Sequence, residues 1–186
     1  MNTGTPNLRN TTPLNYDQRH ALKLNFDYRL NENQGPEIFG VYPLENVGFN
    51  ATFYTGSGTP YTQDGSPWGG RYQIKGSING ARLPWNNRTS VRIDKTFSLK
   101  GEGKRAHNIN VYLYVQNLFN AENVLGVYER TGSATDDGYL TSTFGQNNVK
   151  RAIDPQAYAM FYNLAILDPE RISLPRRFRF GVSYNF

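Results

Sequence analysis

The stretch that decides the fold reads Arg177-Phe178-Arg179-Phe180-Gly181-Val182-Ser183-Tyr184-Asn185-Phe186. Apolar side chains occupy every second position of this stretch, and basic, small or polar residues occupy the positions between them. Successive side chains of a β-strand point to opposite faces, so a period of two predicts a strand with one apolar face. We therefore expect a strand over 177–186 whose apolar face ends on an aromatic residue.

Four earlier segments repeat this period of two, and they cover residues 19–30, 46–55, 88–99 and 108–118. A membrane-crossing strand needs about 9–11 residues, whereas strands of globular proteins usually have about five or six. All the segments reach the membrane-crossing length. We therefore predict an all-β fold in which about five long antiparallel strands form a segment of a transmembrane β-barrel.

The composition agrees with strands that are apolar on one face only. Aromatic residues make up 14% of the chain, with 13 Tyr and 11 Phe, whereas hydrophobic residues make up only 38%. No run approaches the roughly 20 apolar residues of a membrane-spanning helix. The chain has no cysteine, which excludes disulfides and thiol catalysis. Its net charge of +5 comes from basic residues scattered along the sequence, so we predict no nucleic-acid partner.

The connections between the predicted strands alternate in length. Residues 31–45 and 100–107 form the shorter connections, and residues 56–87 and 129–176 form the longer ones. Bacterial outer-membrane barrels have short periplasmic turns and longer extracellular loops. The alternation therefore predicts two long extracellular loops, a periplasmic C-terminus and a location in the outer membrane of a Gram-negative bacterium, in contact with its lipids.

Three features complicate the prediction of a barrel. Closure takes about eight strands or more, and an open edge in lipid leaves backbone groups without hydrogen bonds. The sequence after Met1 has no signal-peptide pattern, so we expect Met1 to be an internal or artificial start within a longer protein. Lys95 falls on the apolar face of the third predicted strand, where it either reaches towards lipid headgroups or lies at a β-bulge.

Several strings of residues resemble a known family in the same order along the chain. They cover residues 14–20, 56–62, 92–97, 115–120, 136–140 and 175–182, and the most specific is Val115-Gln116-Asn117-Leu118-Phe119-Asn120. Together they resemble the C-terminal β-barrel of TonB-dependent receptors, in particular the large-barrel group with an N-terminal carboxypeptidase-regulatory-like domain. The resemblance extends over nearly the whole chain.

The resemblance implies a barrel of about 22 strands, filled by an N-terminal plug and coupled to inner-membrane energy through a TonB box. This chain has no counterpart of the plug or the box. It would supply part of the barrel wall and the outer loops for uptake of a ligand, and it would not be an active transporter alone. The implied partners are the remaining strands and the plug, the TonB complex and the barrel-assembly machinery. That machinery would read the apolar face of the last strand, at Phe178, Phe180, Val182, Tyr184 and Phe186.

The barrel prediction assigns two groups of site residues. Charged residues on the polar faces of the strands would face the lumen, and they are Lys23, Asp27, Arg92, Asp94, Arg177 and Arg179. Flat aromatic side chains in loops are suited to bind sugars or apolar ligands, and the candidates are Tyr61, Trp68, Tyr72 and Trp85. Packing of the loop, or a place in an aromatic girdle, is the alternative role of these four residues.

No catalytic, metal or cofactor site is predicted, and we expect no enzyme activity. The only histidines are His20 and His107, which fall at opposite ends of the predicted strands, with His107 in a turn. Asp136-Asp137-Gly138 lacks the further spaced ligands of a calcium loop and is predicted to be a solvated turn. Asp154 followed by Pro155 predicts the start of a short helix.

The alternative fold is a secreted β-sandwich that binds carbohydrate through the same loop aromatics. A sandwich hides its apolar faces between two sheets and uses shorter strands. Solubility without detergent distinguishes it from a barrel segment.

Overall fold

The computed structural model describes residues 11–100 and 106–185. The chain forms two compact units. The sheet unit comprises His20–Gly56, Asn86–Asn123 and Leu174–Phe186, and the loop unit comprises Met1–Arg19, Ser57–Trp85 and Val124–Ser173. The long strands all belong to the sheet unit, and the helices all belong to the loop unit.

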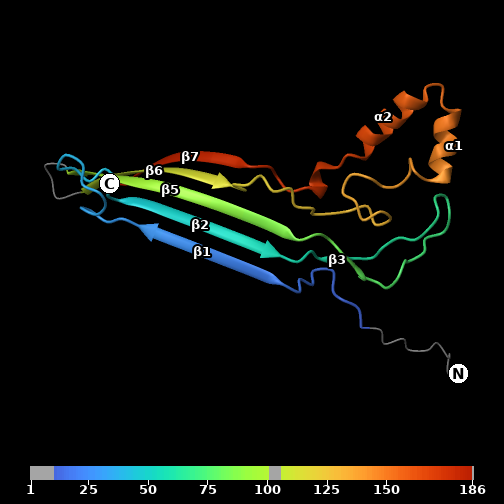
Figure 1. Ribbon diagram of the computed structural model, residues 1–186, viewed down its shortest axis with the longest axis horizontal. Helices are drawn as coiled ribbons and strands as arrows, with labels where there is room; N and C mark the ends of the chain where they lie inside the picture. Colours follow the sequence, from blue (N-terminus) through green and yellow to red (C-terminus); the bar gives the residue numbers. More distant parts are fainter. Residues whose placement is uncertain (1–10, 101–105, 186) are drawn as a thin grey trace. The chain divides into compact units, whose positions relative to one another are not determined.

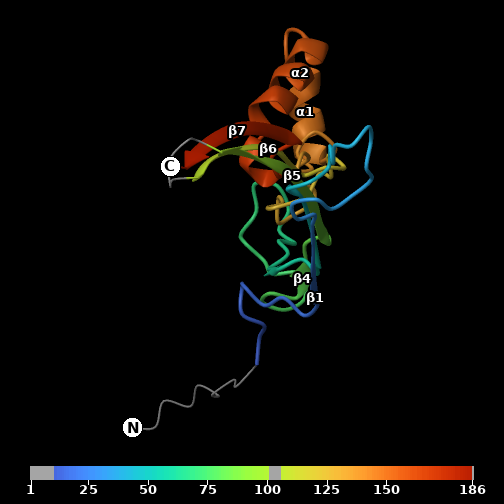
Figure 2. The same ribbon diagram turned by 90° about the vertical axis from the view of Figure 1, so that its left-hand side faces the viewer.

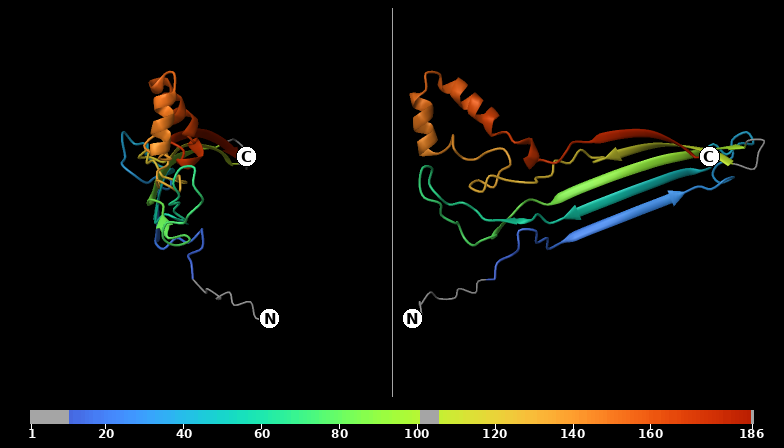
Figure 3. Two further views of the ribbon diagram at one scale, coloured as in Figure 1. Left: turned by 90° about the vertical axis from the view of Figure 1, so that its right-hand side faces the viewer. Right: turned by 180° about the vertical axis from the view of Figure 1, so that it is seen from behind.

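The sheet unit is built on one antiparallel sheet of five strands (Figure 1). In spatial order they are β1 (Ala21–Arg29), β2 (Val47–Gly56), β5 (Asn86–Lys100), β6 (Ala106–Gln116) and β7 (Arg177–Asn185). Figure 3 shows the same neighbouring strands from behind. The predicted antiparallel β architecture is confirmed. The sheet is not closed, because within the described residues β1 and β7 are its two edges.

Left-handed asparagines set the limits of two strands. Asn46, with φ 57°, immediately precedes β2, and Asn117, with φ 56°, immediately follows β6. Asparagine tolerates this conformation better than most residues, and the positive φ turns the chain out of its extended form. As a result β6 ends before Asn117, whereas the sequence pattern predicted a strand that continued to residue 118.

The two ends of the sheet differ in the connections that leave them. Gly56 pairs with Asn86, and Gln116 pairs with Arg177, so both long connections leave from one end of the sheet, which we call the loop end. At the opposite end, which we call the turn end, Arg29 pairs with Gly48 and Lys100 pairs with Ala106. The strand ends that the long connections join and those that the short connections join therefore lie at opposite ends of the sheet.

The loop unit contains two helices, α1 (Thr143–Arg151) and α2 (Pro155–Ile166), which lie next to each other (Figure 2). The predicted short helix is confirmed as α2, because the Asp154 carboxylate accepts hydrogen bonds from the first backbone N–H groups at 3.0 Å. The first helix was not predicted, and its cap is Ser142. The unit also contains a 3-10 helix η1 (Pro169–Arg171) and a two-stranded sheet of β3 (Pro60–Tyr61) and β4 (Ala81–Arg82).

No helix within residues 11–100 and 106–185 has both the length and the apolar composition of a membrane span.

The strand register gives the five-stranded sheet two unlike faces. Directly paired residues of neighbouring strands share a face. One row on the apolar face reads Phe26, Ala51, Val91, Val115 and Phe178 from β1 to β7. The next row lies on the polar face and reads Asp27, Asn50, Arg92, Tyr114 and Arg179. The period of two in each strand is thus kept in register across the whole sheet.

The apolar face carries large exposed side chains. Phe180 on β7 is 70% exposed and Phe26 on β1 is 57% exposed, whereas Asp94 on the polar face is only 6% exposed. Val115 and Tyr139 are the only hydrophobic residues that are buried in the described part of the chain. A globular protein buries its large apolar side chains. In this sheet many of them are exposed, and one carboxylate, Asp94, is buried.

Candidate functional site

The six charged residues predicted to face a lumen all lie on the polar face of the sheet. They come from β1, β5 and β7, and they are Lys23, Asp27, Arg92, Asp94, Arg177 and Arg179. The structure brings them to one surface because each stands at a strand position whose side chain points to the polar face. Whether that surface faces a lumen stays a prediction.

Asp94 is the centre of this face. Its Oδ2 accepts hydrogen bonds from Arg29 Nη1 at 3.4 Å and from Asn110 Nδ2 at 3.1 Å, and Arg92 Nε lies 3.6 Å from its Oδ1. The Arg92 guanidinium also lies over the Tyr112 ring, 4.3 Å from its centroid. A buried carboxylate needs charged or hydrogen-bonding partners, and here it holds two arginines against the sheet.

Two glycines provide space for this network. Arg29, Gly48, Asp94, Tyr112 and Gly181 form one row across the sheet. A Cβ at Gly48 would lie 2.8 Å from Arg29 Nη2 and 2.9 Å from Asp94 Oδ1, and a Cβ at Gly181 would overlap the Tyr112 ring. The glycines therefore allow the arginine and the tyrosine to extend over the neighbouring strand.

The polar face carries an excess of positive charge. Its charged side chains, where the structure describes them, are the cations Lys23, Arg29, Arg88, Arg92, Arg177 and Arg179 and the carboxylates Asp27 and Asp94. The prediction that the basic residues do not form a patch is therefore wrong for the strands. They are scattered along the sequence, but the antiparallel register gathers them on one face. The scatter of basic residues therefore no longer argues against a nucleic-acid partner. The absence of such a partner stays a prediction.

The apolar face of the last strand is placed as predicted. Phe178, Phe180, Val182 and Tyr184 are all more than half exposed and lie on one face of the edge strand β7. Phe186 lies outside the described residues. The role of this strand in assembly stays a prediction.

Trp68 is the predicted loop aromatic that lies beside Tyr139 and Arg130. Its Nε1 donates to the Gly138 carbonyl oxygen at 3.3 Å, its ring meets the edge of Tyr139 at 5.2 Å, and the Arg130 guanidinium covers it at 4.4 Å. These contacts agree with the alternative prediction for Trp68, that its ring packs the loop together instead of binding a ligand. The other three aromatics differ in exposure: Tyr61 is half-buried, whereas Tyr72 and Trp85 are exposed.

A hollow of ≈ 460 Å³ lies beside Trp68 in the loop unit. Two arginine–aromatic pairs line it, Arg130 on Trp68 and Arg171 on Tyr128, the latter at 3.7 Å. Asp64 also lines it and pairs with Arg130 Nη2 at 3.0 Å. Hydrogen bonds from the hydroxyl and backbone N–H of Ser66 lower the pKa of Asp64, so this carboxylate stays charged. Tyr61, Tyr72 and Trp85 are not among the residues that line the hollow.

The predicted solvated turn at Asp136-Asp137-Gly138 is wrong for one of its carboxylates. Asp137 is buried, and it accepts a hydrogen bond from the Tyr162 hydroxyl at 2.5 Å and from the backbone N–H of Tyr139 at 2.9 Å. The Tyr139 and Tyr162 rings stack at 4.5 Å. Burial, then the bond to Asp137, raises the pKa of Tyr162. This carboxylate anchors α2 through the Tyr162 hydroxyl.

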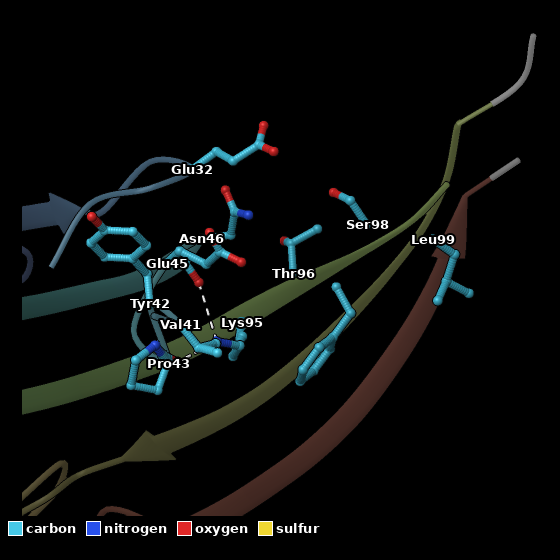
Figure 4. Close-up of a pocket in the computed structure, with 11 residues that line it drawn as sticks. Glu32, Val41, Tyr42, Pro43, Glu45, Asn46, Lys95, Thr96, Ser98 and Leu99 are labelled. Atoms are coloured by element: carbon cyan, nitrogen blue, oxygen red, sulfur yellow. Dashed lines mark hydrogen bonds between the residues drawn. The ribbon is translucent and has the colours of Figure 1, made fainter. Parts of the chain in front are cut away.

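Lys95 lies in unbroken register, paired with Val47 on one side and Val111 on the other, so it is not at a bulge. Its ammonium group donates to the carbonyl oxygens of Pro43 and of Glu45, the latter at 3.3 Å (Figure 4). The contacts lie in a hollow of ≈ 430 Å³ at the turn end, beside β5. The ammonium group thus reaches the connection that follows β1, while it also lies 5.4 Å from the centroid of the Phe97 ring on the apolar face.

The two histidines lie at opposite ends of the sheet. His20 immediately precedes β1 at the loop end, whereas His107 lies in β6 near the turn end and not in a turn as predicted. The His107 Nδ1 atom is 2.7 Å from the Tyr184 hydroxyl, and the two rings stack at 5.8 Å. In the described part of the chain no three His, Cys, Asp or Glu residues come together as metal ligands.

Sequence reasoning missed Arg29, Arg88 and the two spacer glycines. The two arginines could have been found from the sequence, because both occupy polar positions of the alternation, as the predicted lumen-facing residues do. The glycines could not be found from the sequence, because their role depends on which residues lie opposite them.

No family model, curated protein or solved structure matches this chain. The resemblance to TonB-dependent receptors therefore rests on the sequence strings alone.

Proposed function

We propose that this chain forms part of the wall of an outer-membrane β-barrel, in a receptor for TonB-dependent uptake of a ligand. The observation that carries the proposal is the exposure of large apolar side chains on one face of the sheet. Large apolar side chains are exposed on one face, among them Phe26, Ile93 and Phe180, while a charged group, Asp94, is buried on the polar face. In a bilayer an apolar face of this extent meets acyl chains, whereas in water it needs a covering partner.

Strand length supports the proposal. The shortest long strands have 9 residues, and β5 has 15. Crossing a bilayer takes about 9–11 residues at a tilt of about 45°. Each strand is therefore long enough to span the hydrocarbon region.

The free edges of β1 and β7 indicate that more strands belong to the wall. Backbone groups without partners cost several kcal/mol each in lipid, so both edges need neighbours. The remaining strands of a larger barrel would supply them. The chain alone would then contribute structure and loops, and not transport.

The loop unit would contribute contacts to the ligand. Trp68 and the exposed aromatics Tyr72 and Trp85 are the candidates, because aromatic faces bind sugars and apolar groups. The hollow beside Trp68 combines an aromatic ring with arginine and carboxylate side chains, which suits a polar ligand with hydrogen-bonding groups.

The experiment is purification of residues 1–186 with and without detergent, followed by flotation with liposomes. We expect the chain to aggregate without detergent and to float with the liposomes after detergent removal. A monodisperse soluble monomer that stays out of the liposome fraction would contradict the proposal.

The second candidate is a β-sandwich that binds carbohydrate, favoured by the same alternation of residues. It requires a second sheet over the apolar face. The other sheet of the described chain has two residues in each strand, too few to cover five strands. The soluble outcome of the same experiment would favour it.

A further inference from the structure

Three neighbouring rows of the polar face, which contain Lys23, Asn25 and Asp27 on β1, hold five cations and one carboxylate. We call Lys23, Arg88, Arg92, Arg177 and Arg179 the basic patch, and Asp27 is the carboxylate among them. Four of the five make no ion pair with a described carboxylate, and only Arg92 is paired, with Asp94. The charge of the patch is therefore largely uncompensated within the described chain.

We propose that the basic patch docks an acidic polypeptide segment in extended form. The spacing of the cations favours this partner. Arg177 and Arg179 are two residues apart on one strand, which separates them by about 7 Å along it. Alternate side chains of an extended peptide have the same separation, so carboxylates at every second position can meet successive arginines.

The side chains between the cations fit the same partner. Tyr114 lies between Arg92 and Arg179 in one row, and Tyr54 lies between Lys23 and Arg88 in another. Arginine and tyrosine are the residue types that dominate protein–protein interfaces, and the guanidinium fork matches a carboxylate with two hydrogen bonds. A lipid surface is disfavoured as the partner, because the apolar side chains that lipid would contact lie on the opposite face.

This inference concerns the face opposite to the one that carries the proposed function, and it goes beyond that function. The two can fail separately. Flotation with liposomes tests the apolar face, whereas peptide binding in detergent tests the polar face.

The experiment measures binding of a fluorescent oligoglutamate peptide to residues 1–186 in a zwitterionic detergent. We expect saturable binding that is lost between about 0.01 M and 1 M salt, because the Debye length falls from about 30 Å to about 3 Å. An oligolysine peptide is expected not to bind. An oligogalacturonate and a single-stranded oligonucleotide serve as polyanions of other classes.

A double variant, Arg177→Gln with Arg179→Gln, is expected to weaken oligoglutamate binding about tenfold or more. The matched control removes two exposed charges of the loop unit, Arg71→Gln with Lys75→Gln, and should change the affinity less than about twofold. Far-UV circular dichroism checks that both variants keep the sheet. The proposal is overturned if oligoglutamate does not bind, if the control variant loses as much affinity, or if either other polyanion binds more tightly.

Discussion

The two faces of the sheet are built from the same five strands, yet they are organised differently. The apolar face presents large exposed side chains, such as Phe26 and Phe180, and its described cross-strand ring contact joins Phe26 to Phe49 at 6.2 Å. The polar face is tied together by contacts across strands, from Arg29 to Asp94 and from Arg92 to Tyr112. Side chains on the apolar face depend on their surroundings for stabilisation, whereas those on the polar face stabilise one another.

This difference indicates what each face requires. An exposed apolar surface gains stability only from an apolar environment, at about 25 cal/mol per Å² removed from water. A buried carboxylate with two arginines and an amide already has its partners. We therefore expect substitutions on the apolar face to act through the bilayer, and substitutions on the polar face to act through the contacts within the sheet.

The largest effect is expected for Phe180→Arg on the apolar face. Phe180 pairs with Leu113 in the middle of β7, so a charge there would lie near the bilayer midplane. Arginine at that depth costs about 2–4 kcal/mol. The free energy of unfolding in liposomes, measured by urea titration, should fall by this amount.

The matched control for this variant is Ser183→Arg, on the other face of the same strand. Its effect should be clearly smaller, because in the proposed barrel wall that side chain points away from the acyl chains. Equal losses of unfolding free energy in Phe180→Arg and Ser183→Arg would contradict the proposal that only the apolar face contacts lipid.

An intermediate effect is expected for Gly48→Val on the polar face. The added side chain would occupy the place of the Arg29 guanidinium and press on Asp94, and overpacking of this kind costs about 1–3 kcal/mol. The measurement is again the free energy of unfolding, here in detergent as well. Adding Arg29→Ala should recover part of the loss, and a full loss in the double variant would show that Arg29 is not the group displaced.

The smallest effect is expected for Lys23→Gln. This side chain is exposed and has no carboxylate partner in the described chain, so the free energy of unfolding should change by less than about 0.5 kcal/mol. Binding of an acidic peptide is a separate measurement and is expected to weaken. A destabilisation as large as that of Gly48→Val would mean that Lys23 takes part in the contacts that stabilise the polar face.

The strands could be predicted from the sequence because a period of two is a local property. Residues such as Arg177, Phe178 and Arg179 reveal a strand and its faces without any partner. The α2 helix could be predicted for the same reason, since Asp154 and Pro155 form a local start signal. The strand limits were less accurate where Asn117 leaves the extended conformation.

Features that depend on register or burial could not be predicted in this way. The basic patch exists only because β1, β5 and β7 are aligned, and scattered positions in the sequence do not reveal that alignment. The burial of Asp137 depends on Tyr162, which lies 25 residues further along the chain. The bond from Lys95 to Pro43 depends on the path of a connection that has no regular pattern.

The central claim is that the apolar face lies in lipid and the polar face does not. The chain has no cysteine, so a single introduced cysteine labels one position without further changes. We would label Val182→Cys and Ser183→Cys with a fluorophore, insert each variant into liposomes, and measure quenching by lipids brominated in the acyl chain. Strong quenching at position 182 with weak quenching at position 183 is the predicted result, and equal quenching at the two positions would contradict the account.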